Sequence, residues 1–163
     1  MESPVELKGK KVLAVDDEPD VLDSIEGILS MCEVEKVQSF KEAKHLLETK
    51  TYDAAILDIM GVDGYRLLEV TTKLDIPTLM LTAHALNPQN LVKSVKKGAS
   101  AYIPKEKLTE ISVFLADVLE ERQSGKRHRR WFQRLESFFE EKFDRYWKER
   151  MDEGKEFWKK YFY

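Results

Sequence analysis

Short apolar runs alternate with amphipathic stretches along the first 120 or so residues. An unbroken apolar run is typical of a strand that is buried on both faces, whereas apolar residues spaced three or four apart predict a helix with one buried face. Each run precedes such a stretch, so we expect strands and helices in strict alternation. The expected strands are residues 11–17, 35–39, 53–59, 76–83 and 101–105.

Turn and capping residues support this division. Pro19 is placed where the first turn of a helix tolerates proline, and Ser39 is an expected helix N-cap. Pro88 follows Asn87 at the start of a further helix, and Gly98 ends it. A last helix is expected over residues 108–119. Five strands alternating with five helices predict an α/β fold with a parallel sheet and right-handed crossovers.

Composition and charge set the scale of the molecule. The chain has 163 residues, of which 42% are hydrophobic, enough for one domain and an appendage. Its formal net charge is −3, so the chain as a whole does not have the basic character of a nucleic-acid binder. Counting along the sequence, residues 1–121 carry 14 basic and 22 acidic side chains, and residues 122–163 carry 13 and 8. We therefore expect a domain over 1–122 and a separate extension over 123–163.

Localisation is inferred from what the sequence contains. Cys32 is the one cysteine, which excludes an intrachain disulfide and fits a reducing compartment. We expect no signal peptide, because the first residues lack an apolar segment, and no apolar run reaches the roughly 18 residues of a membrane span. The expected location is the cytoplasm.

Reactive side chains stand at the ends of the expected strands. They are Asp16, Asp17, Asp58, Thr82 and Lys105. In an open parallel sheet, ligands bind outside the carboxyl ends of the strands, so these groups are expected to converge. Carboxylates bind Mg²⁺, an ammonium and a hydroxyl suit a phosphoryl group, and a carboxylate can be the nucleophile that receives it.

In their order, spacing and strand-end placement, these residues resemble the receiver domains of two-component response regulators. The resemblance covers about residues 10–122 and includes the segment Tyr102-Ile-Pro-Lys105. It implies a flavodoxin-like, doubly wound five-stranded sheet with strand order 2-1-3-4-5. It also implies a partner, either a sensor histidine kinase or a phosphotransfer protein.

The resemblance further implies a role for each site residue. Asp58 would be the phosphoacceptor. Asp17, Asp58 and the Met60 carbonyl would ligate Mg²⁺, and Asp16 would hold the metal through water. Three carboxylates packed together without a cation are unfavourable, which is a physical reason for the metal.

The remaining residues would respond to the phosphoryl group. Lys105 would pair with Asp58 at rest and with the phosphoryl oxygens afterwards. Thr82 would donate its hydroxyl to the phosphoryl group. Tyr102 matches the family's switch aromatic, which turns inward when Thr82 moves.

Two departures from the family pattern are visible. The loop at 59–62 is shorter than usual by about two residues and has no proline. Glu106 follows Lys105 where the family often has a proline after a cis peptide bond. A non-proline cis bond costs roughly 2.5–4 kcal/mol, so a trans bond is expected here.

Two functions of other classes compete with a receiver. One is a Mg²⁺-dependent phosphohydrolase with Asp58 as a transient nucleophile, but Met60 stands where such enzymes usually have an acid. The other is an oligomerisation module whose receiver no longer signals. The complete set of strand-end residues favours a phosphoaccepting receiver, whose only catalysis is its own phosphorylation and dephosphorylation.

The spacing of apolar residues in the extension predicts a long amphipathic helix that breaks near Gly154. Its broad apolar face is aromatic and needs a partner. The aromatic stripe comprises Trp131, Phe132, Phe138, Phe139, Phe143, Tyr146, Trp147, Trp158 and Phe162. We expect self-association through residues 126–163 as a helical pair or coiled coil, with packing on the chain's own receiver or on another protein as alternatives. A membrane surface is disfavoured by the acids on the polar face, and no nucleic acid is expected because the segment is too short for a helix-turn-helix unit.

Overall fold

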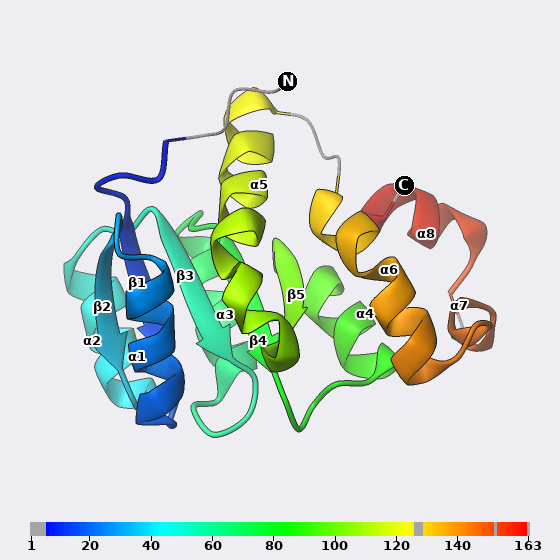
Figure 1. Ribbon diagram of the computed structural model, residues 1–163, viewed down its shortest axis with the longest axis horizontal. Coiled ribbons are helices and arrows are strands. Elements are labelled where there is room, and N and C mark those ends of the chain that lie inside the picture. Colours follow the sequence, from blue (N-terminus) through cyan, green and yellow to red (C-terminus); the bar gives the residue numbers. More distant parts are fainter. Residues whose placement is uncertain (1–5, 126–128, 152, 163) are drawn as a thin grey trace.

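Five parallel strands form the centre of the molecule. The computed structural model describes residues 6–125, 129–151 and 153–162. The sheet has the order β2-β1-β3-β4-β5 (Figure 1), which confirms the predicted doubly wound fold. The strands are β1 Lys11–Val15, β2 Glu33–Val37, β3 Ala54–Asp58, β4 Thr78–Thr82 and β5 Ala101–Pro104.

Burial of the strands follows the apolar pattern. Every residue of β3, β4 and β5 is buried, as expected for strands with helices on both faces. The edge strand β2 is only partly buried and carries charged residues. It was predicted at 35–39 and lies two residues earlier, because Ser39 leaves the strand to cap the next helix through a hydrogen bond from the Glu42 N–H.

Helices cover both faces of the sheet. Contacts join α1 to α5 and α2 to α3, and Figure 1 shows α1 and α5 in front of the sheet. The Asn87 side chain caps α4 by accepting from the Asn90 N–H at 2.7 Å. The helices are α1 Pro19–Ile28, α2 Phe40–Thr49, α3 Gly64–Lys73, α4 Pro88–Lys96 and α5 Ile111–Ser124. The helix predicted at 108–119 therefore starts later, after the 3-10 helix η1, Lys105–Glu110.

The described residues of the extension form three helices instead of one long one. They are α6 Arg130–Phe143, α7 Trp147–Arg150 and α8 Lys155–Tyr161. Asp144 ends α6 with a φ of 145°, and its carboxylate accepts from the Tyr146 N–H at 2.7 Å. A local bond of this kind competes with helix continuation, which is why the predicted single helix is wrong here. The break expected near Gly154 is present, since Gly154 is the N-cap of α8.

Five of the nine residues of the aromatic stripe are fully buried within the chain. Trp131, Phe132, Phe139, Trp147 and Phe162 are each at most 1% exposed. Helix α6 contacts β5 and α5, and the extension lies at the β5 end of the sheet (Figure 1). The structure therefore shows packing on the chain's own receiver, one of the alternatives to self-association.

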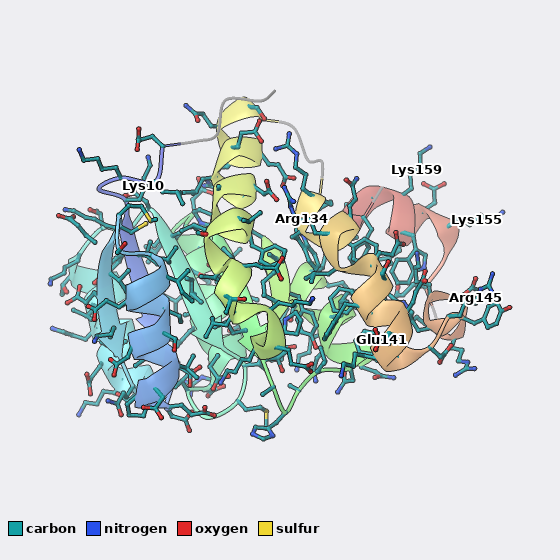
Figure 2. All side chains as sticks on the ribbon, viewed as in Figure 1. Lys10, Arg134, Glu141, Arg145, Lys155 and Lys159 are labelled. Atoms are coloured by element: carbon teal, nitrogen blue, oxygen red, sulfur yellow. The ribbon has the colours of Figure 1, made fainter. Side chains whose placement is uncertain are left out.

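An ion pair also joins the extension to α5. The Arg134 guanidinium donates to Asp117 on α5 at 2.6 Å, and Figure 2 shows Arg134 on the side of α6 that faces α5. Much of the apolar face that motivated self-association is thus covered over the described part of residues 126–163; residues 126–128, 152 and 163 lie outside it. Among the described helices, none has the length and apolarity required to cross a membrane.

Candidate functional site

Carboxylates meet at the carboxyl ends of β1 and β3. The two strands pair in parallel with Val15 opposite Leu57, so the residues that follow them emerge at the same edge. Asp16 is fully buried and Asp58 is 5% exposed, whereas Asp17 faces solvent. The fold therefore places two carboxyl groups in the protein interior with a third at its rim.

Lys105 joins this cluster from the end of β5. Its Nζ lies 2.9 Å from Asp16 Oδ2 and 3.3 Å from Asp58 Oδ1. It also lies 3.6 Å from Glu18 Oε1, a residue that the sequence analysis did not anticipate although it directly follows two aspartates. Burial by itself would lower the pKa of Lys105, but the hydrogen bond and charge of Asp16 and the charge of Asp58 raise it above its ordinary value. Lys105 is therefore a fixed cation.

One ammonium does not balance the buried carboxylates. Burial, followed by repulsion from Asp16, raises the pKa of Asp58 from 3.8 to about 6, although Lys105 acts in the opposite direction. Burial also raises the pKa of Asp16. The site thus has a deficit of positive charge when both carboxylates are ionised.

The donor set suits a hard divalent cation. Carboxylate oxygens of Asp16, Asp17 and Glu18 lie within 4.8 Å of one another, and Mg²⁺ prefers oxygen ligands. Gly61 has a φ of 81°, and a Cβ there would be only 2.6 Å from Asp17 Oδ2. The loop backbone after Asp58 therefore lies against the Asp17 carboxylate, so the shortened loop still closes over the acidic cluster. The residues present fit Mg²⁺.

A second glycine brings the same loop close to Asp58. A Cβ on Gly64 would stand 2.2 Å from the Asp58 carbonyl oxygen. Asp63, just before it, has a left-handed φ of 56°. The Asp-Gly turn signal indicated a turn here, but the close approach to Asp58 depends on the tertiary structure. The Met60 side chain is 55% exposed.

Thr82 and Tyr102 form a separate pair next to the acidic cluster. Thr82 ends β4 and is 1% exposed, and its Oγ1 accepts from the Ala85 N–H at 2.9 Å. Tyr102 is fully buried, and its hydroxyl donates to the Ala85 carbonyl at 2.7 Å. Asp58 pairs with Leu81 across the sheet, which puts Thr82 one residue beyond the level of Asp58.

The segment after Lys105 shows how the second departure is accommodated. No cis peptide bond occurs among the described residues, which confirms the expected trans bond between Lys105 and Glu106. The chain continues directly into η1. Neither of two cavities of about 630 and 640 Å³ includes Asp58 or Lys105; one lies beside β2 and the other between α4, α5 and α8. Asp17 and Glu18 are the exposed members of the acidic cluster, and Asp16 and Asp58 lie buried behind them.

Comparison with known proteins agrees with this geometry. Residues 12–113 match the response regulator receiver domain family. The chain is 34% identical over 103 residues to the two-component response regulator ARR18 of Arabidopsis thaliana, covering 60% of this chain and 16% of that protein. It is 34% identical over 125 residues to ARR11 of the same plant, covering 72% of this chain and 23% of that protein. The chain thus spans less than a quarter of the length of these relatives.

Solved structures show the same fold. A CheY-like response regulator receiver domain protein from Methanospirillum hungatei is 31% identical, with a TM-score of 0.60 over 71% of this chain and 99% of that one. A response regulator structure from Chloroflexus aurantiacus is 28% identical, with a TM-score of 0.62 over 69% of this chain and 99% of that one. With the matching sheet order and the strand-end carboxylates, these findings show that the chain belongs to the response regulator receiver domain family.

Proposed function

We propose that Asp58 accepts a phosphoryl group from a phosphohistidine on a sensor histidine kinase or a phosphotransfer protein. The observation that carries this proposal is the Asp58 carboxylate, which is 5% exposed and held 3.3 Å from Lys105 Nζ beside the Asp16–Glu18 carboxylates. An acceptor needs an ionised oxygen and a neighbouring cation for the incoming charge. The Asp58 carboxylate and the Lys105 ammonium supply them.

The transfer follows from the groups present. A carboxylate oxygen of Asp58 forms a bond to phosphorus as the bond from phosphorus to the partner's imidazole nitrogen breaks, and the imidazole leaves with the bonding electron pair. The Lys105 ammonium then pairs with the phosphoryl oxygens, and the Thr82 hydroxyl turns to donate to one of them. Asp17, Asp58 and the Met60 carbonyl would hold Mg²⁺, with Asp16 acting through water, and the ion would supply positive charge for the transferred group.

One observation counts against the competing hypothesis of a phosphohydrolase. Turnover requires an acid or base beside the leaving group. The residue two positions after Asp58 is Met60, whose side chain is apolar and 55% exposed. Hydrolysis is therefore expected to be limited to the protein's own aspartyl phosphate. The buried aromatic stripe supports neither a solely oligomeric role nor a nucleic-acid partner.

The proposed organisation has two parts. Residues 1–122 form the phosphoaccepting receiver, and residues 123–163 form a helical extension that packs on it. We place the protein in the cytoplasm, consistent with a single cysteine, Cys32, that is not in a disulfide. Its signal would be the change in conformation that follows phosphorylation of Asp58.

Intact-mass measurement after incubation with acetyl phosphate and Mg²⁺ tests the proposal. We expect one added phosphoryl group that is lost on treatment with hydroxylamine, requires Mg²⁺ and is absent in Asp58→Asn. Asp75→Asn is the matched control, because Asp75 is 86% exposed and pairs with Arg122. A phosphoryl adduct that persists in Asp58→Asn would place the nucleophile elsewhere.

A further inference from the structure

The extension contacts the receiver at Tyr102, the buried aromatic residue of β5. The Phe139 ring on α6 lies 6.1 Å from the Tyr102 ring, centroid to centroid, and both side chains are fully buried. Phe139 is itself held by stacking on Phe143 at 5.4 Å and by Phe132 at 6.1 Å. The docked α6 therefore packs an aromatic side chain against the Tyr102 ring.

Tyr102 in turn holds the loop that follows β4. Its hydroxyl donates to the Ala85 carbonyl at 2.7 Å and accepts from the Asn87 N–H at 3.2 Å. The Ala85 N–H donates to Thr82 Oγ1. One aromatic ring therefore connects the extension to the loop that follows Thr82, the residue assigned to the phosphoryl group.

A second contact reaches the other side of the site. Glu106, immediately after Lys105, pairs with Lys142 of α6 at 3.4 Å. The Lys107 ammonium lies 5.5 Å from the centre of the Phe138 ring. A shift of the Lys105 backbone therefore disturbs contacts with α6, as does a shift of the Thr82 loop.

Ion pairs away from the acidic cluster also hold the extension against the receiver. Arg134 makes two hydrogen bonds to Asp117 on α5, at 2.6 and 3.3 Å. Lys96 on α4 pairs with Glu153 at 2.5 Å. The extension thus bridges α4, β5 and α5 through contacts that do not involve Asp58.

We propose that α6 is a built-in ligand of the receiver that keeps Tyr102 in its buried position, so that docking of the extension and phosphoryl occupancy of Asp58 stabilise one another. This inference rests on the proposed function of Asp58. When only a fraction of the protein molecules has the conformation that binds a ligand, the apparent affinity for that ligand is reduced by that fraction. Docked α6 removes that penalty by holding Tyr102 and the Thr82 loop in one arrangement. By linkage, the phosphoryl group must strengthen docking by the same factor.

Beryllofluoride with Mg²⁺, a mimic of the phosphoryl group, provides the first test on the full-length chain. We expect Phe139→Ala to bind it at least about fivefold more weakly than the wild type, the lower end of typical coupling between sites. Phe157→Ala is the matched control, because Phe157 is an aromatic of α8 whose described ring partners are Trp158, Tyr161 and Phe162. That control should bind within about twofold of the wild type.

Hydrogen exchange of the wild-type chain provides the reciprocal test and needs no variant of the extension. Saturating beryllofluoride should slow exchange of the α6 amides by the same factor that separates the two affinities, and should leave them unchanged in Asp58→Asn. All three tryptophans of the chain, Trp131, Trp147 and Trp158, lie in the extension, so their fluorescence reports whether it stays docked in each variant.

The outcomes separate the two proposals. Beryllofluoride binding that is indifferent to Phe139→Ala, or α6 exchange that is unchanged in the wild type, overturns the coupling and leaves the role of Asp58 intact. A wild-type chain that does not bind beryllofluoride, or an Asp58→Asn variant that binds it equally well, overturns both. Binding that Phe139→Ala weakens, together with slower α6 exchange, supports the coupling.

Discussion

Asp58→Asn is expected to stabilise the metal-free protein at neutral pH. The pKa of Asp58 rises from 3.8 to about 6 in the folded protein, mainly through burial and then through the charge of Asp16. A rise from 3.8 to about 6 corresponds to roughly 3 kcal/mol, at about 1.4 kcal/mol for each pH unit. Above that pH the folded protein holds an ionised, buried carboxylate, and asparagine removes its cost.

The sign of the pH dependence follows from proton binding. Between pH 3.8 and about 6 the folded state binds more protons than the unfolded state at this carboxyl group. The stability that the protonated group retains is therefore lost as the pH rises through that window. The advantage of Asp58→Asn should grow from nearly zero below about pH 4 to about 3 kcal/mol above about pH 7. Lys105 stays paired in the variant, because its Nζ lies 2.9 Å from Asp16.

Urea unfolding in the presence of EDTA, at a series of pH values, measures this difference. For a chain of this size, 3 kcal/mol corresponds to a rise in Tm of roughly 6–12 °C. Asp75→Asn, at an exposed carboxylate, should show no such pH-dependent gain. Adding Mg²⁺ should stabilise the wild type and have little effect on Asp58→Asn. An Asp58→Asn variant that is no more stable than the wild type at pH 8, or whose gain is equal at pH 4 and pH 8, would refute the electrostatic argument.

Two further predictions concern the loop and the extension. Gly61→Ala should lower the free energy of unfolding by about 1–2 kcal/mol, because the φ of this residue is 81°. It should also weaken Mg²⁺ binding, measured by calorimetry, because the added Cβ would displace the Asp17 carboxylate. Unchanged Mg²⁺ affinity would contradict this placement of the loop. Phe132→Ala should destabilise the docked extension by about 3–5 kcal/mol, measured by denaturant titration of tryptophan fluorescence, because Phe132 is fully buried and lies 4.5 Å from the Phe162 ring. Tyr146→Ala, at a side chain that is 57% exposed, should change that free energy by less than about 0.5 kcal/mol, and an equal loss in the two variants would contradict the packing described.

Much of the receiver was predictable because its signals are local. Continuous apolar runs identified the buried strands, and the capping roles of Ser39 and Asn87 depend only on nearby residues. The strand ends located Asp16, Asp58 and Lys105, because parallel strands release their chains at one edge of the sheet. The structure brings these three side chains together.

Other parts of the site were not predictable from spacing. Glu18 joins the cluster through the direction of its side chain toward Lys105. Gly61 and Gly64 matter because of the backbone and side-chain atoms that lie beside them. Such approaches depend on how the loop after β3 folds over β1 and α1, which local sequence does not encode in an obvious pattern.

The extension separates most clearly what the sequence determined from what the tertiary structure decided. By itself, the sequence determined the order of the reactive residues at the strand ends. It also determined that residues 123–163 have an aromatic face, because helical periodicity places their apolar side chains on one side, which must be covered. The sequence did not determine what covers that face. The choice between a second copy and the chain's own β5 depends on the shape of the receiver surface and on distant partners such as Asp117 for Arg134. Only the folded chain brings Phe139 onto Tyr102, because that contact joins residues whose proximity depends on where α6 docks.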